Sequence, residues 1–436
     1  MDISSYLLQA KHIHFIGIGG IGVSAIARKF LLEKKIITGS DMVVSPLVKD
    51  LQSLGARIWQ GHTVSHITKD VDVVIYTKAV SNDNPELVRA QELGIPTFTY
   101  SQALGIISAD MYTIAVAGSH GKTTTTGMIA WGLLQAKKDP TVIVGSLLTD
   151  IPTNFIAGKS DYFVVEACEY GKSFLDLNPR IAVITNIDND HLDYYKTKAN
   201  LVKAFTAFAQ KIPQNGYLIT NLKDSACARI ADAVSCHVID YSSLITPADA
   251  KLIGDHNAMN MRAASAVLRT LHIPQGTIYK ALASFSGTAR RLEYKGITKQ
   301  GMIIYDDYAH HPTEVIATLR AIRNHFIDKK IICVFQPHLY SRTKLLFKDF
   351  VKNFLIPDVL IILPIYAARE KKDPSISSQK LVVALRARRK EKVTVYADSC
   401  ERAVREVYKH IDKDSLLITM GAGEAYRVGD AFLGKK

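Results

Sequence analysis

The feature that most constrains the fold is a layout that the chain repeats: a short apolar run, a glycine-rich or polar turn, and a helical pattern. It occurs in HIHFIGIGGIGVSAIARKFLL, residues 12–32, and again in MYTIAVAGSHGKTTTTGMIA, residues 111–130. Short buried strands that alternate with helices predict parallel sheets covered by helices. We therefore expect an α/β fold.

The bulk composition favours a folded protein of several domains. A chain of 436 residues suggests about three domains, and 47% hydrophobic residues supply ample core. No apolar run reaches the roughly 18 residues of a membrane helix, and residues 1–30 lack a signal-peptide pattern. The five cysteines form no C-x-x-C pair. These features predict a cytoplasmic protein without membrane insertion.

The net charge of +13 allows two kinds of partner, nucleic acid or phosphorylated small molecules. The lysines are dispersed, and the chain has neither a low-complexity basic tail nor an aromatic RNA-binding motif. We therefore expect phosphorylated substrates and no nucleic-acid partner.

The first glycine turn has the spacing G-x-G-x-x-G between a predicted strand and a predicted helix, the context in which it binds a diphosphate. The next predicted strand ends in an acid, where a Rossmann-like domain binds a ribose. An NAD domain and a domain for another nucleotide both fit. The candidate residues are Gly17, Gly19, Gly20, Gly22, Ser40 and Asp41.

The second turn is a shortened phosphate loop. The usual pattern requires a glycine at position 116, where this chain has Val116, and the glycine comes instead at Gly118. Even so, the loop offers backbone N–H groups, a lysine for phosphate oxygens and a hydroxyl for Mg²⁺. The candidate ATP-binding residues are Gly118, Ser119, His120, Gly121, Lys122, Thr123 and Thr124.

Two further apolar strands end in residues that can bind a metal. DYFVVEACE carries Glu166, and RIAVITNIDNDH ends at His191. Because ligands gather at the carboxyl ends of parallel strands, we expect both residues near Lys122 and Thr123. Glu169, three residues after Glu166, is the alternative metal ligand, or else a residue that supports the ligands without binding the metal.

After residue 290 the strand, polar turn and helix layout returns in GMIIYDDYAHHPTEV, KIICVFQPHLYSRT and SLLITMGAGEAY. This part also predicts a doubly wound domain. Its strand ends carry candidate binding residues, namely Asp307, Tyr308, His310, His338 and Arg342.

The ordered motifs resemble those of the Mur ligase family, the ATP-dependent amide-forming enzymes of peptidoglycan precursor synthesis. They are HFIGIGGIG, GSD, GSHGKTTTT, EACEYGKSF, TNIDNDHLDYY, HNAMN, RRLE, DDYAHHPTEV, FQPHLYSRT and GAGE. DDYAHHPTE and FQPH point to the member that adds L-alanine to the carboxylate of UDP-N-acetylmuramate through an acyl phosphate. The resemblance implies a Rossmann-like UDP-sugar domain over 1–109, a P-loop ATPase-like central domain over 110–290 and a Rossmann-like amino-acid domain over 291–436.

The resemblance also implies roles for single residues. Thr123, Glu166 and His191 would bind metal, with Mg²⁺ as the cofactor beside ATP and Mn²⁺ as an alternative. The catalytic set would be Lys122, Glu166, His191 and Arg291. Further ATP contacts would come from Asn257, Asn260, Arg290 and Asp307. The amino-acid site would comprise Tyr308, His310, His338 and Arg342, and the first glycine turn would hold UDP rather than NAD.

Some positions depart from the family pattern. Leu339 follows FQPH where many relatives have Arg, residues 99–110 lack an Arg often found there, and Glu424 replaces the usual Asp. The alternatives that stay open are a recycling ligase that adds a whole tripeptide, a nucleotide-binding regulator without catalysis, and a nicotinamide oxidoreductase. We expect a monomer or a homodimer.

Overall fold

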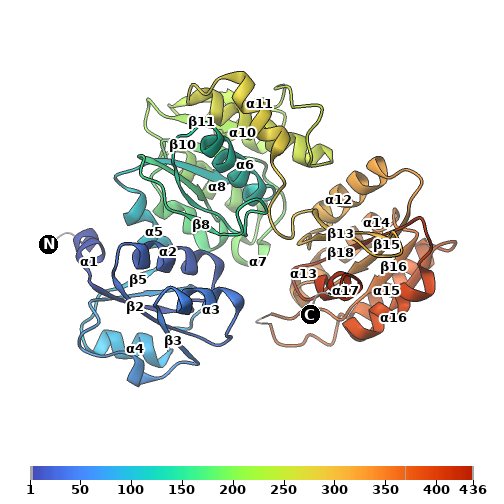
Figure 1. The fold of residues 1–436 in the computed structure, drawn as a ribbon, viewed down its shortest axis with the longest axis horizontal. Helices are drawn as coiled ribbons and strands as arrows, with labels where there is room; N and C mark the ends of the chain where they lie inside the picture. The colour runs from blue at the N-terminus through green and yellow to red at the C-terminus, as the bar shows by residue number, and fades with distance from the viewer. Residues whose placement is uncertain (1–2, 369, 435–436) are drawn as a thin grey trace. The chain divides into compact units, whose positions relative to one another are not determined.

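The computed structural model describes residues 3–368 and 370–434, which form an α/β structure with three sheets (Figure 1). The predicted fold class is therefore confirmed. The chain divides into two compact units, one of Met1–Asp249 with Asn260–Phe285 and the other of Ala250–Met259 with Ser286–Lys436. The first unit contains two of the sheets and the second contains one. The three exact domain ranges stay a prediction.

The N-terminal sheet is entirely parallel, with strand order β3-β2-β1-β4-β5. Its strands are β1 (His12–Ile16), β2 (Ile36–Asp41), β3 (Arg57–Gln60), β4 (Val73–Tyr76) and β5 (Thr97–Thr99). The helices of this part are α1 (Ile3–Gln9), α2 (Ile21–Leu32), α3 (Pro46–Ser53), η1 (Val64–His66), α4 (Pro85–Glu92) and α5 (Tyr100–Ser108).

Strand β1 is the centre of this sheet, and all five of its residues are buried. One face of the sheet packs against α2 and α3 through Phe15, Phe30 and Leu51. The opposite face packs against α4 through Ile16 and Leu87. Helices thus cover both faces of the sheet, as is typical of parallel sheets.

The central sheet has the order β12-β11-β10-β6-β9-β7-β8 and is parallel except for the pair β7 and β8. Its strands are β6 (Tyr112–Ala117), β7 (Thr141–Ile143), β8 (Phe155–Ile156), β9 (Tyr162–Glu166), β10 (Ile181–Ile184), β11 (Tyr217–Thr220) and β12 (His237–Asp240). Its helices are α6 (Lys122–Gln135), η2 (Tyr170–Asp176), α7 (Leu192–Tyr195), α8 (Lys198–Ala209), α9 (Ser225–Ala231), α10 (Asp255–Thr270) and α11 (Gln275–Ser284).

A single hydrophobic core joins the N-terminal and central sheets. It extends from Phe15 and Phe30 through Leu104 on α5 to Phe174 and Phe205 beside the central sheet. This shared core is the physical reason that both sheets belong to one compact unit. Strand β6 lies between β10 and β9, so the turns that follow these three strands are neighbours.

The second unit contains a six-stranded sheet of order β13-β14-β18-β15-β16-β17, antiparallel only at β13. Its strands are β13 (Glu293–Ile297), β14 (Ile303–Asp307), β15 (Lys330–Phe335), β16 (Val359–Ile362), β17 (Val393–Tyr396) and β18 (Ser415–Met420). The helices are α12 (Pro312–His325), α13 (Tyr340–Leu345), α14 (Phe347–Asn353), α15 (Ser378–Arg388), α16 (Cys400–His410) and α17 (Tyr426–Phe432).

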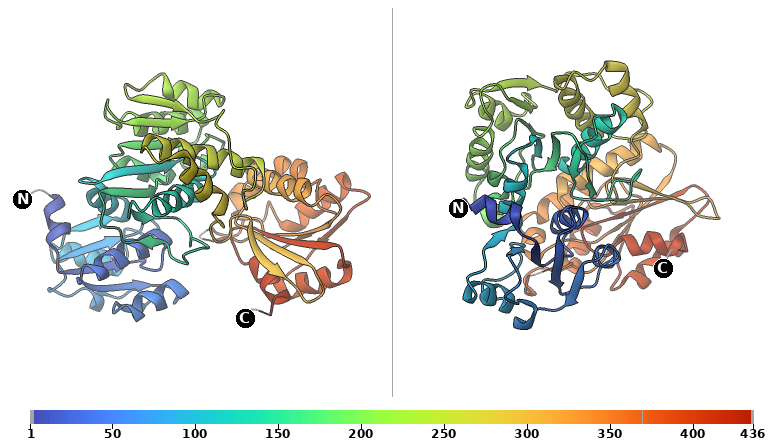
Figure 2. Two further views of the ribbon diagram at one scale, coloured as in Figure 1. Left: turned by 45° about the horizontal axis from the view of Figure 1, so that its top comes forward. Right: turned by 60° about the vertical axis from the view of Figure 1, so that its left-hand side comes forward.

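Helices cover both faces of this sheet (Figure 2). One core contains Leu319 of α12, Phe350 of α14 and Leu381 of α15. The other contains Val407 of α16 and Val428 of α17. The predicted doubly wound C-terminal domain is thus confirmed as a three-layer arrangement.

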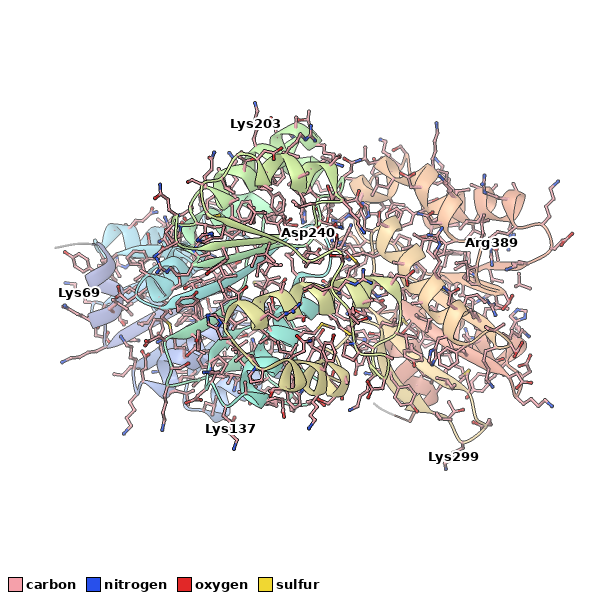
Figure 3. All side chains as sticks on the ribbon, turned by 90° about the horizontal axis from the view of Figure 1, so that it is seen from above. Lys69, Lys137, Lys203, Asp240, Lys299 and Arg389 are labelled. Carbon is pink, nitrogen blue, oxygen red and sulfur yellow. The ribbon has the colours of Figure 1, made fainter. Side chains whose placement is uncertain are left out.

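The dispersed lysines project outward from separate parts of the chain, among them Lys69, Lys137, Lys203 and Lys299 (Figure 3). All four are exposed. Within the described residues, none of the helices has the length and apolarity that crossing a bilayer requires.

Candidate active site

The shortened phosphate loop runs from the end of β6 to the start of α6, and glycine geometry explains its shape. Gly118 has φ +134° and Gly121 has φ +82°, conformations that residues with a side chain rarely adopt. A Cβ on Gly118 would lie 1.9 Å from Oγ1 of Thr185, and one on Gly121 would lie 2.3 Å from Oδ1 of Asn260. The loop is therefore wrapped too closely by its neighbours to accept larger residues.

The polar end of β10 holds this loop in place. The backbone N–H of Ser119 donates to the carbonyl of Asn186 at 2.9 Å, and that of His120 donates to the Asn186 side chain at 3.0 Å. The Thr185 hydroxyl donates to the His120 carbonyl at 2.6 Å. His120 also pairs with Asp188 at 3.1 Å. These contacts preorganise the turn that opens α6.

Lys122, the first residue of α6, turns back over the loop. Its ammonium donates to the carbonyls of Gly118 and Ser119 and to Oε1 of Glu169, the last at 3.0 Å. Burial by itself lowers the pKa of Lys122 and is the largest single influence on it, but the charges of Glu169, Cys168 and Glu166 and the hydrogen bond to Glu169 together outweigh burial and raise the pKa. A permanently charged ammonium therefore lies at the mouth of the loop.

Glu169 connects Lys122 to His191. Its carboxylate is 1% exposed, and Oε1 lies 3.6 Å from Nε2 of His191. Its other oxygen, Oε2, is buried and accepts no hydrogen bond from any described residue. Glu169, Asp190 and His191 each present a ligand atom, and the three atoms lie within 4.8 Å of one another. Such a cluster has the donor set and spacing to hold a cation.

The backbone of His191 is strained at this position. Its φ is +54°, a left-handed conformation that is uncommon for residues other than glycine. It caps the short helix α7, and its ring packs 5.1 Å from that of Tyr170. Strained backbone of this kind clusters at functional sites.

Glu166 ends β9 and has a different partner. Its Oε2 accepts from the backbone N–H of Gly145 at 3.0 Å. Its charge is among those that raise the pKa of Lys122, so it faces the same region, but it is not part of the group formed by Glu169, Asp190 and His191. The loop, Glu166 and His191 are thus brought together, with Glu169 as the residue in direct contact with Lys122.

The glycine turn of the N-terminal sheet opens onto a cavity of about 540 Å³, a size suited to a nucleotide. Gly17, Gly19, Gly20 and Asp41 line it. Asp41 is fixed by N–H donation from Gly19 at 2.8 Å and from Val43 at 3.0 Å.

Two of the predicted UDP-sugar residues do not line this cavity. Gly22 packs against Tyr100, whose hydroxyl lies 2.5 Å from where its Cβ would be. Ser40 donates to the buried carboxylate of Glu86. The sequence analysis did not single out His62 and Asn84, which do line the cavity. Both come from loops without a phosphate motif, and no sequence signal marked them.

In the second unit the four predicted amino-acid-binding residues form one chain of contacts. The rings of Tyr308 and His310 are 5.4 Å apart, as are those of His310 and His338. Nη1 of Arg342 lies 2.8 Å from Nδ1 of His338. Leu339, which departs from the family pattern, has φ +67° and directly precedes α13 at its N-cap position.

Neighbouring arginines of this unit have different surroundings. Arg290 donates to Asp306 at 2.9 Å and to the carbonyl of Gly421 at 2.6 Å. Arg291 places its guanidinium 5.1 Å from the Tyr308 ring and makes no side-chain hydrogen bond to a described residue. Of the two, Arg291 therefore keeps its donors available.

Asp307 ends β14 and is almost fully buried. It accepts from the Thr318 hydroxyl at 2.5 Å and from the N–H of Ala309 at 3.0 Å. Burial raises its pKa to about 6, although the Thr318 hydrogen bond and the charge of Arg291 oppose this shift.

Asn257 and Asn260 lie on α10, which spans the boundary between the two units. Asn257 donates to the Ile253 carbonyl at 2.9 Å within the second unit. Asn260 packs on Gly121 within the first, directly beneath the phosphate loop.

Three family models cover most of the chain. The Mur ligase family, catalytic domain matches residues 12–112, the Mur ligase middle domain matches 116–248, and the Mur ligase, glutamate ligase domain matches 290–423.

Curated relatives of similar length agree with these matches. The UDP-N-acetylmuramate--L-alanine ligases of Clostridium acetobutylicum and Alkaliphilus metalliredigens are both 42% identical to this chain, and each alignment covers 98% of both sequences.

Solved structures share the fold. UDP-N-acetylmuramate-alanine ligase from Thermotoga maritima superposes with a TM-score of 0.82 at 24% identity, covering 98% of this chain and 99% of that one. A murein peptide ligase from Psychrobacter arcticus gives 0.71 at 22% identity, covering 97% and 98%. With its two glycine turns, three sheets and full-length relatives, this chain belongs to the Mur ligase family.

Proposed function

We propose that this protein joins L-alanine to the carboxylate of UDP-N-acetylmuramate in peptidoglycan precursor synthesis, with conversion of ATP to ADP and phosphate. The observation that carries the proposal is the presence of two glycine turns of the phosphate-binding kind in one compact unit, at Gly17–Gly20 and Gly118–Gly121. Two such turns suit two phosphorylated substrates. The names of the full-length relatives supply the identity of the sugar nucleotide and the amino acid.

The chemistry follows from the weakness of a carboxylate as an electrophile. Transfer of the γ-phosphoryl group of ATP to a carboxylate oxygen gives an acyl phosphate and ADP. The amine of L-alanine then attacks the acyl carbon, a tetrahedral intermediate forms, and phosphate leaves with the C–O bond electrons as the amide forms. Lys122 is placed to balance negative charge on the phosphates, which lowers the barrier to their approach to a carboxylate.

The cluster beside Lys122 fits a magnesium ion. Carboxylate oxygens are the ligands that Mg²⁺ prefers, and the buried Oε2 of Glu169 is an oxygen without a hydrogen-bond donor among the described residues. We propose Thr123, Glu166 and His191 as ligands, joined by Glu169 and Asp190 from the geometric cluster. A bound Mg²⁺, or Mn²⁺ in its place, would offset the charge between phosphate and carboxylate.

In the second unit we assign the α-carboxylate of L-alanine to Arg342, because a guanidinium can bind it in a bidentate manner. Tyr308, His310 and His338 would complete this amino-acid site. Arg291, whose donors are available, is the better candidate to contact phosphate, while Arg290 supports the sheet through Asp306. Asn257, Asn260 and Asp307 would contact ATP.

The deciding experiment follows phosphate release from ATP and UDP-N-acetylmuramate with one amine at a time. L-alanine should support turnover, and glycine and L-serine test the fit of the pocket, where one methyl group is worth about 1 kcal/mol. A preference for a tripeptide would favour the recycling ligase instead. Absence of phosphate release with every amine, together with tight NAD(H) binding, would refute the proposal.

We further propose that the protein acts in the cytoplasm, where its nucleotide substrates are found, and that it needs no nucleic acid. A state of monomer or homodimer is the expectation, which sedimentation of the purified protein tests.

A further inference from the structure

A lysine of the N-terminal part contacts the turn that follows Glu169. Lys78 lies in the loop after β4, and its ammonium donates to the carbonyl of Gly171 at 2.9 Å and to the hydroxyl of Ser173 at 3.1 Å. Gly171 and Ser173 belong to η2, which begins directly after Glu169. The contact lies within the first compact unit and connects its N-terminal part to its central part.

The loop around Lys78 also forms part of the wall of the N-terminal cavity. Its backbone turns tightly, because the N–H of Val80 donates to the Thr77 carbonyl at 3.0 Å. Thr77, Ala79 and Val80 line the cavity, whereas Lys78 does not. Thr77 packs closely on the glycine turn, since its methyl carbon lies 2.5 Å from where a Cβ of Gly17 would be. A ligand in the cavity therefore meets the residues on either side of Lys78 and restricts the backbone that carries its side chain.

Hydrogen bonds hold the turn after β9 at four successive carbonyls. The carbonyls of residues 168–170 each accept a hydrogen bond of 2.9 Å from a group of residues 172–174. The next carbonyl, that of Gly171, accepts instead from Lys78, which lies 93 residues earlier in the chain. The N-terminal part thus supplies a hydrogen bond that the turn does not provide for itself.

The turn that Lys78 contacts has a strained backbone. Gly171 has φ +59° and Lys172 has φ +56°. The left-handed region is accessible to glycine but unfavourable for lysine, because the Cβ comes too close to the following carbonyl oxygen. Such a conformation persists only when its surroundings hold it in place. Because Gly171 lies two residues after Glu169, weaker support for the turn would displace the carboxylate that accepts from Lys122.

We propose that Lys78 is a positioning residue that couples the N-terminal cavity to the phosphate-loop site. A ligand in the cavity orders the backbone around Lys78, so the side chain loses less entropy when it bonds to Gly171. The turn then holds Glu169 against Lys122. Binding at either site strengthens binding at the other by the same factor. The inference rests on the proposed function, with a UDP-sugar in the cavity and ATP with Mg²⁺ at the phosphate loop.

Calorimetry on the full-length protein tests this coupling. A non-hydrolysable ATP analogue with Mg²⁺ is titrated into the protein with and without saturating UDP, which lacks the sugar carboxylate that would meet Mg²⁺ directly. We expect UDP to tighten binding of the analogue at least about fivefold. Lys78→Met keeps an unbranched side chain but removes the ammonium, so this ratio should fall to near one. UDP alone should bind to the variant with nearly unchanged affinity, because Lys78 does not line the cavity.

Two further variants separate positioning from a general effect on the fold. Lys78→Arg should keep most of the coupling, since a guanidinium can donate to the same carbonyl. Lys69→Met, at an exposed lysine in the segment before β4, is the matched control and should keep the ratio of the unaltered protein.

Hydrogen exchange supplies a measurement in the absence of ATP. The N–H groups of Lys172 and Phe174 are bonded within the turn, to the carbonyls of Glu169 and Cys168. Their exchange should slow when UDP is added to the unaltered protein, because the turn opens less often. In Lys78→Met the addition of UDP should leave their exchange unchanged.

Equal binding of the analogue with and without UDP by the unaltered protein would overturn the inference, as would a Lys78→Met ratio equal to that of Lys69→Met. Absence of UDP binding would overturn both the inference and the proposed sugar-nucleotide site. Failure of the proposed function alone is distinct, since it would show as absent alanine-dependent phosphate release in a protein whose response to UDP is intact.

Discussion

The ammonium of Lys122 lies 3.0 Å from a carboxylate oxygen of Glu169, and the two residues come from different strand ends of the central sheet. The pair keeps a positive charge at the phosphate loop and leaves the second oxygen of Glu169 buried and available. This arrangement suits a site that receives a triphosphate and a cation together. We therefore expect different effects from replacing Lys122 and from replacing Glu169.

Replacement of Lys122 by Ala should reduce phosphate release by about a hundredfold or more, because preorganised charge at the transferring phosphoryl group is lost. The effect should fall mainly on kcat. Lys138→Ala, at an exposed lysine just beyond the end of α6, is the control and should leave turnover unchanged. Equal turnover of Lys122→Ala and the unaltered protein would contradict the assigned role.

The two glutamates of β9 and the following turn should respond differently to conversion to Gln. Glu169→Gln leaves the Lys122 charge buried without a carboxylate, so stability should fall by about 3 kcal/mol. Glu166→Gln keeps that pair and should leave stability nearly unchanged, while it raises the Mg²⁺ concentration that gives half-maximal phosphate release by at least about tenfold. Since both glutamates are proposed Mg²⁺ ligands, magnesium titration should show a weaker site in both variants, and urea unfolding separates them; an equal loss of stability in the two variants would argue against distinct roles.

A methyl group at Gly118 should disrupt the phosphate loop. Its φ of +134° is strained for alanine, and the added Cβ would overlap Thr185. We expect Gly118→Ala to lose ATP binding and to unfold at lower denaturant concentration. Gly276→Ala is the control, because an added Cβ at this position in α11 meets nothing within 4 Å. This variant should keep ATP binding, and its free energy of unfolding should rise by up to about 1 kcal/mol. Normal ATP binding by Gly118→Ala would show that the loop tolerates side chains.

Asp307→Asn should change how stability depends on pH. Burial raises the pKa of Asp307 from 3.8 to about 6, so the folded state binds its proton more tightly than the unfolded chain. The favourable contribution of this group is therefore complete below pH 4 and is lost as pH rises through about 6. Between pH 4 and pH 7, the free energy of unfolding of the Asn variant should therefore rise by on the order of 1–3 kcal/mol relative to that of the unaltered protein. Urea unfolding at four pH values measures this; parallel profiles would contradict it.

Much of this protein could be predicted from local sequence patterns. The βα layout specified α/β structure, and the glycine spacings located both turns, because the positive φ of Gly17, Gly118 and Gly121 is a local requirement. Strand ends likewise marked Glu166 and His191 as neighbours of Lys122, since parallel strands deliver their carboxyl ends to one edge.

Tertiary structure decided what no local pattern contains. The sheet order β10-β6-β9 determines which turns meet, and the path of the turn after β9 then puts Glu169, rather than Glu166, in contact with Lys122. The N-terminal cavity likewise draws His62 and Asn84 from loops without a motif, 22 residues apart. Spacing along the chain predicts the elements and their turns, whereas long-range packing selects which side chains become partners. The reason is that a buried charged group loses its water, so its stability depends on all the groups that surround it in the fold.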